Sequence, residues 1–222
     1  MSVDIAEVEF ALNLVQGSPE WLAYKCGKVG ASRVGDITAK IKDGKASASR
    51  EAYAGELIAE RLTGINADNY KSAAMQWGND VEPLARTHYA FEKMTTVETV
   101  GCVLHPKIVG SLASPDGLIG DHGLLEVKCP ATHTHIATLL GAPVPDRYIK
   151  QAMWQLACTG RRWVDLVSYD PRMPENMKLH VTPIPRNDEL IAVLEDEVKA
   201  FLADVDERLA ALTDTYGQAV AA

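Results

Sequence analysis

The chain has 222 residues, 47% of them hydrophobic and 23% charged, with a formal charge of −8 at pH 7; a chain of this size can bury one sizeable core, so residues 1–222 are expected to form a single domain. No apolar run approaches the roughly 20 residues of a membrane-spanning helix, and the first residues lack the basic and apolar segments of a secretory signal, so we expect no membrane partner. The four cysteines are scattered without a CxxC pair, which favours reduced thiols in a cytoplasmic protein over a disulfide framework.

The first part of the chain is expected to be helical. A serine followed by a proline predicts a helix that Ser18 caps and Gly27 ends. Ser32 is expected to cap a second, short helix that leads towards Lys40. The Lys-, Gly- and Ser-rich residues 41–49 then predict a loop.

Two longer helices follow this loop. The first is expected over residues 49–62, with Ser49 at its start and Gly64 just after its end. The second is expected over residues 73–94. Because Pro83 lies inside it, we expect a kink or a break near Glu82, and a distorted helix can direct that carboxylate towards a metal.

The second half of the chain combines strand and helix patterns. A final helix starts at Asn187 and has apolar residues at three- and four-residue steps, so it packs on the core, which we prefer, or contributes to subunit contacts. The order of elements predicts an α/β fold in which helices flank both faces of a central mixed β-sheet. Strands are expected at residues 96–100, 101–105, 163–169 and 178–184 and in a hairpin over 118–129, and helices at residues 133–140 and 146–159.

The hairpin is expected to bring two carboxylates and an ammonium together. Ser114-Pro115-Asp116-Gly117 precedes its first arm, and Leu125-Glu126-Val127-Lys128-Cys129 belongs to its second. Strand side chains alternate between faces, so Glu126 and Lys128 point the same way. The turn between the arms brings Asp116 close to Glu126. Two carboxylates with water suit Mg²⁺, and a lysine beside them can orient or deprotonate a water that attacks phosphorus.

A solvated strand face would also explain an acid-x-Lys triplet, which is common in proteins. Here, however, Glu126 and Lys128 lie in an otherwise apolar run, where charged side chains need a reason to be present. The proline turn in addition presents Asp116 at the entrance of a strand. These features favour the core of a metal-dependent nuclease.

Several further short sequence segments follow one another along the chain. They are Gly30-Ala31-Ser32, Trp77-Gly78 with Glu82, Ala85-Arg86-Thr87, the two hairpin segments extended to Leu118 and Pro130, Tyr148 with Gln151, and Tyr169-Asp170-Pro171-Arg172-Met173. Together they resemble the bacteriophage lambda exonuclease and YqaJ-type viral recombinase nucleases of the PD-(D/E)xK superfamily. The resemblance covers about residues 16–173 and implies a restriction-endonuclease-like PD-(D/E)xK core.

The resemblance also implies roles for the residues of the hairpin. Asp116 and Glu126 would bind the metal together with the backbone carbonyl of Val127, while Lys128 would hold the attacking water or stabilise charge on phosphorus. Loss of Asp116, Glu126 or Lys128 should raise the barrier by at least ~3 kcal/mol, about a hundredfold in rate. Two more site residues come from helices: Glu82, as a metal ligand, and Gln151, which would bind a ligand or the phosphate.

Three residues stand where the family binds a terminal 5′-phosphate. Lys25, Ser32 and Ser114 occupy the positions of a basic residue and two hydroxyls, which suit the acceptor oxygens of a phosphate. Lysine in place of the family's arginine keeps the charge but loses the bidentate fork, so the phosphate would be held more loosely.

Two histidines follow the Glu-x-Lys motif. Where the family has a further arginine this chain has Thr134, flanked by His133 and His135. A histidine replaces that contact in a pH-dependent manner, or the contact is absent, so strict dependence on a 5′-phosphate is in doubt. His133 and His135 with Cys129 also suggest zinc, but one such pair at this spacing is a weak pattern.

The remaining candidates each have two interpretations. Met75 stands where the family has an apolar wedge between the DNA strands, or it packs in the core. Tyr148 lines the cleft or merely packs. Basic residues on or beside the predicted loop clamp DNA or only keep the loop soluble: Lys40, Lys42, Lys45 and Arg50.

The resemblance finally implies a function. A magnesium-dependent enzyme, with Mn²⁺ able to substitute, would degrade one strand of linear double-stranded DNA from its 5′ end, and a single-strand annealing protein would use the 3′ overhang in phage-type recombination. A homotrimeric ring, encoded by a phage or prophage, would do this in the bacterial cytoplasm. The charge of −8 argues against loose coating of DNA but not against cleavage. The alternatives are a structure-specific or endonucleolytic DNase without end recognition and a non-catalytic DNA-binding relative.

Overall fold

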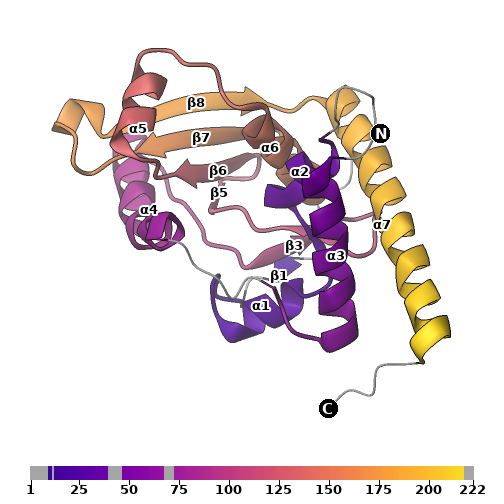
Figure 1. Ribbon diagram of the computed structural model, residues 1–222. Helices are drawn as coiled ribbons and strands as arrows, with labels where there is room; N and C mark the ends of the chain where they lie inside the picture. The colour runs from indigo at the N-terminus through magenta and orange to yellow at the C-terminus, as the bar shows by residue number, and fades with distance from the viewer. Residues whose placement is uncertain (1–9, 12, 40–46, 68–72, 218–222) are drawn as a thin grey trace.

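The computed structural model describes residues 10–11, 13–39, 47–67 and 73–217. Figure 1 shows the arrangement of its helices and strands. In chain order they are β1 (Phe10–Ala11), α1 (Pro19–Lys25), β2 (Val29–Gly30), the 3₁₀ helix η2 (Ala31–Arg33), α2 (Val34–Ile37), α3 (Ala48–Thr63), α4 (Ala73–Glu92), β3 (Cys102–Leu104), β4 (Ser111–Ala113), β5 (Gly117–Ile119), β6 (Gly123–Lys128), α5 (Thr132–Leu139), α6 (Asp146–Thr159), β7 (Trp163–Tyr169), the 3₁₀ helix η3 (Glu175–Met177), β8 (Leu179–Pro185) and α7 (Asp188–Tyr216).

The predicted α/β fold with mixed sheets and flanking helices is confirmed, but the strands form two four-stranded sheets. One has the order β1-β3-β4-β2 and the other β5-β6-β7-β8. In the second sheet β6 is antiparallel to β5 and parallel to β7, which in turn is antiparallel to β8. The parallel pair directs the ends of β6 and β7 to the same edge, next to α4 and α5 in Figure 1.

Alternation along β6 divides the interior into two cores. Leu124 belongs to a core that this sheet forms with α6, whereas Leu125 and Val127 belong to a second core with α4. Glu126 and Lys128 lie two and four residues after Leu124, so they share its face of the strand. The sequence pattern therefore places both charged side chains towards α6.

The helix ends follow the predicted signals in part. The Ser18 hydroxyl accepts a hydrogen bond from the backbone N–H of Trp21, 3.2 Å away, as expected for a cap. Ser32 does not cap a helix but lies inside η2, and α3 is capped by Ser47 one residue before its start rather than by Ser49. Ser47 has the extended backbone that a helix cap requires, whereas Ser49 already lies inside the helix.

Differences also occur around Pro83 and in the short strands. The helix α4 is continuous through Pro83, so the predicted break is absent. Residues 96–100 do not form a strand; Glu98 makes a single bridge to Leu118. The strands β2 and β4 were not predicted. The last helix is capped by Asn187 and packs on the core as preferred, with buried residues Ile191, Leu194, Val198, Phe201, Leu202 and Val205. Across the residues that the structure describes, no helix has the length and apolar character needed to cross a bilayer.

Candidate active site

The hairpin of β5 and β6 holds Asp116 against the second strand. The backbone N–H of Asp116 donates to the carbonyl of Leu125 over 3.1 Å, and Asp116 Oδ2 accepts from the N–H of Val127 over 2.7 Å. Residues two apart in a strand direct their peptide groups to the same side. The carbonyl of Val127 is therefore directed to the side of Asp116.

Glu126 is the buried centre of the site. Its side chain is only 4% exposed. Oε1 accepts from Lys128 Nζ at 2.5 Å and from Gln151 Nε2 at 2.6 Å, while Oε2 accepts from Gln155 Nε2 at 2.5 Å. A buried carboxylate is costly unless it is paired and hydrogen-bonded. These three donors meet that requirement and fix the orientation of the carboxylate.

Lys128 is held as a cation among these groups. Burial alone would lower the pKa of its ammonium, but the carboxylates of Glu126 and Asp116 outweigh it and raise the pKa above its ordinary value. Nζ also donates to Gln151 Oε1 at 3.2 Å and lies 4.9 Å from the ring centre of Tyr148. A lysine with a raised pKa keeps its proton, which suits the predicted roles of holding the attacking water or stabilising charge better than deprotonation of the water.

Two glutamines of α6 support the carboxylate, and only one was predicted. Gln151 contacts both Glu126 and Lys128, as described above. Gln155, which is fully buried, follows one helical turn later on the same face. The spacing of four residues was the available signal for Gln155, but a glutamine with no local motif gave no reason to select it.

Glu82 reaches the site from α4. Its carboxylate forms an ion pair with Arg86, one turn further along the helix, and Arg86 was not among the predicted site residues. Burial, and then the nearby charge of Glu126, raise the pKa of Glu82, although Arg86 opposes the shift. Glu82 therefore lies within electrostatic reach of Glu126 without sharing a hydrogen bond with it.

Asp116 shows why a cation fits here. Burial, followed by the charges of Glu126 and Glu82, raises its pKa well above the ordinary value. Its Oδ1 makes no hydrogen bond to any described residue. No three His, Cys, Asp or Glu side chains of the described residues form a metal cage by themselves. Mg²⁺ does not need such a cage, because it commonly binds one or two carboxylates and fills its other positions with water and substrate phosphate.

A polar pocket adjoins the carboxylates. It has a volume of about 130 Å³ and contains all three predicted phosphate-binding residues, Lys25, Ser32 and Ser114, together with Gln151 of the site just described. The Lys25 ammonium lies 3.8 Å above the ring of Trp21, whose Nε1 is 3.3 Å from Ser114 Oγ. The other lining residues are Gln16, Trp21, Gly30, Ala31 and Leu112.

The other candidate residues differ in their surroundings and their exposure to solvent. Tyr148 lies against Lys128, whereas His135 is fully buried, with Nδ1 2.8 Å from Ser168 Oγ and Nε2 2.8 Å from the carbonyl of Met177. The predicted DNA contact of His135 is therefore wrong, and its nitrogens are not free for zinc. His133 is exposed on α5. The side chain of Met75 lies outside what the structure describes.

The basic residues near the predicted loop have mixed outcomes. Lys40, Lys42 and Lys45 lie outside the described residues. Arg50 donates to the carbonyl of Ile37 at 3.0 Å and stacks on Phe201, 5.0 Å from the ring centre. Arg50 thus has a structural role in the packing of α3.

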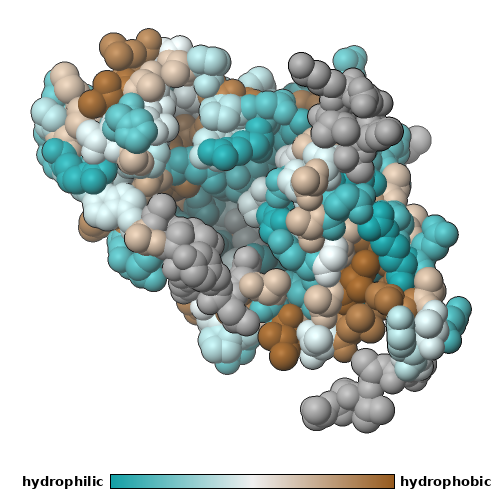
Figure 2. All heavy atoms as spheres, in the orientation of Figure 1, coloured by the Kyte–Doolittle hydropathy of each residue, from teal (hydrophilic) through white to brown (hydrophobic). Residues whose placement is uncertain are grey.

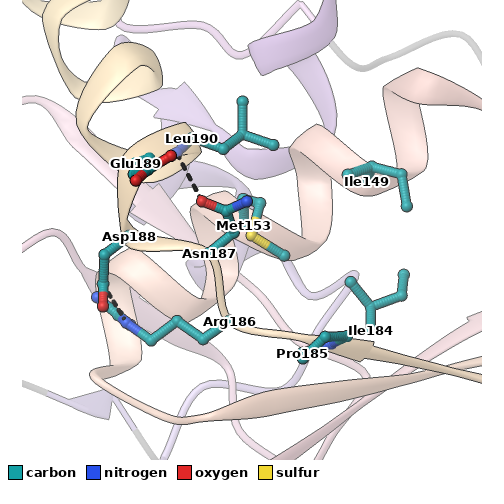
Figure 3. A pocket seen from close by; sticks show the side chains of 9 residues that line it. All are labelled: Ile149, Met153, Ile184, Pro185, Arg186, Asn187, Asp188, Glu189 and Leu190. Carbon is teal, nitrogen blue, oxygen red and sulfur yellow. Dashed lines mark hydrogen bonds and ion pairs between the residues drawn. The ribbon is translucent and has the colours of Figure 1, made fainter.

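A second pocket, of about 570 Å³, lies where α6, β8 and the start of α7 meet (Figure 3). Its arginine is engaged within the chain, since Arg186 Nε contacts Asp188 Oδ1 at 2.6 Å and Nη1 donates to the carbonyl of Leu156 at 2.6 Å. The two acidic residues of this pocket, Asp188 and Glu189, are exposed to solvent. In Figure 2, by contrast, hydrophilic residues surround a hollow over the region where Figure 1 shows β5 and β6.

The chain is similar to a known domain family and to several solved structures. Residues 20–162 match the YqaJ-like viral recombinase domain. An alkaline exonuclease, LHK-Exo from Laribacter hongkongensis, is 47% identical with a TM-score of 0.83, over 89% of this chain and 97% of that chain. Its complex with dAMP matches equally well. A phage related exonuclease from Haemophilus somnus 129PT shares the fold, with 16% identity and a TM-score of 0.65 over 83% of this chain and 96% of the other. No curated protein matches the chain.

Proposed function

Because the chain belongs to the YqaJ-like viral recombinase family, we propose that it is a magnesium-dependent exonuclease that degrades one strand of linear double-stranded DNA from the 5′ end. The observation that carries this proposal is the adjacency of the Asp116, Glu126 and Lys128 cluster to the polar pocket, with Gln151 belonging to both. A 47% identical relative is an alkaline exonuclease, and its complex with the mononucleotide dAMP fits release of single nucleotides.

In this proposal Asp116, Glu126 and the Val127 carbonyl hold the cation, with Glu82 as an outer ligand. Magnesium bound there, with Mn²⁺ as a substitute, would polarise the scissile phosphate and activate water. The chain itself contributes orientation and charge. Gln151 and Gln155 fix the Glu126 carboxylate, and the Lys128 ammonium stabilises negative charge that develops on the phosphate oxygens. Because the pKa of Lys128 is raised, this charge persists at alkaline pH.

End recognition is assigned to the polar pocket. Lys25 supplies a positive charge, and the hydroxyls of Ser32 and Ser114 supply donors for a terminal 5′-phosphate. A DNA end bound in this pocket would place its first phosphodiester next to the carboxylates. Exposed His133 on α5 adds a further side chain that can contact the DNA.

The proposal extends to the biological setting. The 3′ single strand left by the reaction is the substrate for a single-strand annealing protein in phage-type recombination, and a homotrimeric ring would keep the enzyme on its DNA. Both features come from the family and not from any contact within this chain. An acidic protein of charge −8 benefits from such retention, because it lacks long-range attraction to DNA.

The test is a digest of duplexes labelled at the 5′ or the 3′ end of one strand, with and without a 5′-phosphate. We expect the 5′ label to be released first and only in the presence of Mg²⁺ or Mn²⁺. Asp116→Ala should reduce the rate at least a hundredfold. Earlier release of the 3′ label would reverse the polarity, and cutting of closed circular duplexes would replace the exonuclease by an endonuclease.

A further inference from the structure

A second positively charged group lies at the edge of the sheet that carries Lys128. Arg172 follows β7 by three residues, and its guanidinium lies 4.6 Å above the ring of Trp77, at the start of α4. About half of the Arg172 side chain, 51%, is exposed. An arginine stacked on an aromatic ring with its outer edge in solvent is suited to contact a ligand anion.

The buried carboxylate of Asp170 holds the Arg172 guanidinium in place. Arg172 Nε and Nη2 donate to the two oxygens of Asp170 at 2.7 and 2.9 Å. The Asp170 side chain is 0% exposed and also accepts from Thr132 Oγ1 at 2.7 Å. Because this bidentate pair and the Trp77 ring restrict the rotamers of Arg172, binding an anion would cost little further side-chain entropy. Nη1 makes no hydrogen bond to any described residue.

The position of Arg172 relative to the carboxylates follows from the sheet. β6 and β7 are parallel, and Lys128 pairs with Ser168, so Asp170 leaves the sheet at the same edge as the residues after Lys128. On the other side, α4 carries both Trp77 and Glu82, which are five residues or about 7.5 Å of helix apart. Cys129, next to Lys128, lies within reach of the charges of Glu82, Asp116 and Asp170, so the Asp170–Arg172 pair flanks the proposed catalytic site.

Arg172 is more exposed than Lys128 and Arg86, and it does not neutralise a carboxylate of the proposed site. Lys128 is engaged with Glu126, and Arg86 with Glu82, so both neutralise carboxylates of the site. Asp170 already neutralises Arg172, but the exposed guanidinium edge still offers donors to a second anion. In a chain of charge −8, specific groups of this kind must supply the contacts to DNA.

We propose that Arg172, stacked on Trp77 and anchored by Asp170, binds a backbone phosphate of the DNA strand that lies beside the scissile phosphodiester. This inference rests on the proposed function, since it needs DNA at the edge of β6 and β7. The contact positions the strand and carries no sequence information. Its ligand is a phosphodiester, because the Nη1 end that Asp170 leaves unused offers positive charge and N–H donors to an anionic oxygen.

The experiment measures binding of a 5′-phosphorylated duplex without cleavage, in EDTA, by fluorescence anisotropy at a series of salt concentrations. Loss of one phosphate contact reduces the slope of log affinity against log salt by about 0.9 for a duplex, or about 0.7 for a single strand. We expect this change for Arg172→Gln, together with about tenfold weaker binding. Arg172→Lys, which keeps the charge, should restore the slope but not the full affinity.

Arg162→Gln is the matched control. This arginine is exposed and precedes β7 at the opposite end of the strand. Its substitution therefore removes the same charge far from the sheet edge at which Asp170 and Arg172 lie. Its slope should equal that of the wild type. If Arg172→Gln does not fold, the double variant Asp170→Asn/Arg172→Gln removes the buried charge that would be left unpaired, and its slope can be measured instead.

The outcomes separate the two proposals. An unchanged slope for the Arg172 variants, or an equal decrease for Arg162→Gln, would overturn the assignment of Arg172. If the wild-type protein does not bind a duplex end at all, the proposed function fails and not this inference alone. An Arg172 variant that is less stable but has the wild-type slope would overturn the proposal, because Arg172 would then serve only to neutralise the buried Asp170 carboxylate.

Discussion

At the scale of single residues, Gln155 gives a sharp test of how Glu126 is held. Gln155→Leu removes the donor to Glu126 Oε2 and leaves that oxygen buried without a partner. Leaving a buried carboxylate oxygen unpaired costs about 1–3 kcal/mol, so we expect the single-turnover rate to fall roughly tenfold to a hundredfold. Because Gln155 is fully buried, we expect KM for the duplex to stay constant. A raised KM with an unchanged kcat would contradict this positioning role.

The residues of the site differ in how far the sequence predicts them. Asp116, Glu126 and Lys128 lie in one hairpin, so strand alternation and a turn are enough to bring them together. The partners of Glu126 on α6 come from residues more than 20 positions away, and no local pattern encodes that contact. His135 was misjudged for the same reason: its environment is set by Ser168 and Met177, which are distant in sequence.

At the scale of elements, the space around position 117 restricts which residue can follow Asp116 in the chain. A Cβ built on Gly117 would lie 2.2 Å from Val97 Cγ1, a β-branched side chain with little freedom to move. Gly117→Ala should therefore destabilise the protein by about 1–3 kcal/mol and reduce activity by displacing Asp116. Urea unfolding and initial rates measure the two effects.

Two further variants test the cause of this effect. Val97→Ala combined with Gly117→Ala removes the clashing methyl group and should restore most of the stability and activity. Gly55→Ala in α3, where a new methyl meets nothing within 4 Å, should leave activity unchanged and raise stability by up to about 1 kcal/mol, because alanine favours a helix interior over glycine. If the double variant were as unstable as Gly117→Ala alone, the contact with Val97 would not be the cause.

The elements themselves show which structures a sequence encodes locally. The long helices and β7 follow from caps and periodicity, and Asp146–Thr159 and Trp163–Tyr169 match the expected ranges. The strands β2 and β4 have only two and three residues and pair with each other across 82 positions (Val29 with Ser111), which no local pattern predicts. At Pro83 the helix α4 is continuous, so a proline in the helix interior does not end it.

At the scale of the whole molecule, Asp170 couples stability to pH. Hydrogen bonds from Arg172, and then from Thr132, lower the pKa of Asp170 to about 2, below the roughly 3.9 of an unfolded chain. The stabilisation, about 2 kcal/mol, is thus present above pH 4 and is lost as the pH falls towards 2. Asp170→Asn should be less stable than the wild type at pH 7, with a difference that shrinks between pH 4 and 2 in urea unfolding. A difference that is constant with pH would argue against this linkage.

The metal-free molecule should carry the opposite linkage at Asp116. Burial and the neighbouring carboxylates raise its pKa, so the ionised group destabilises the fold above the pKa of an unfolded aspartate, and this effect is complete above the raised value. In EDTA at pH 8, Asp116→Asn should therefore have a higher Tm than the wild type, since an amide oxygen can still accept from Val127. Adding excess Mg²⁺ should stabilise the wild type by about 1–3 kcal/mol and leave Asp116→Asn unchanged. Asp121→Asn, in the exposed hairpin turn, removes one charge without touching the site and should respond to Mg²⁺ like the wild type. An equal Mg²⁺ shift in all three proteins would mean that the cation acts by screening the net charge and that Asp116 does not bind it.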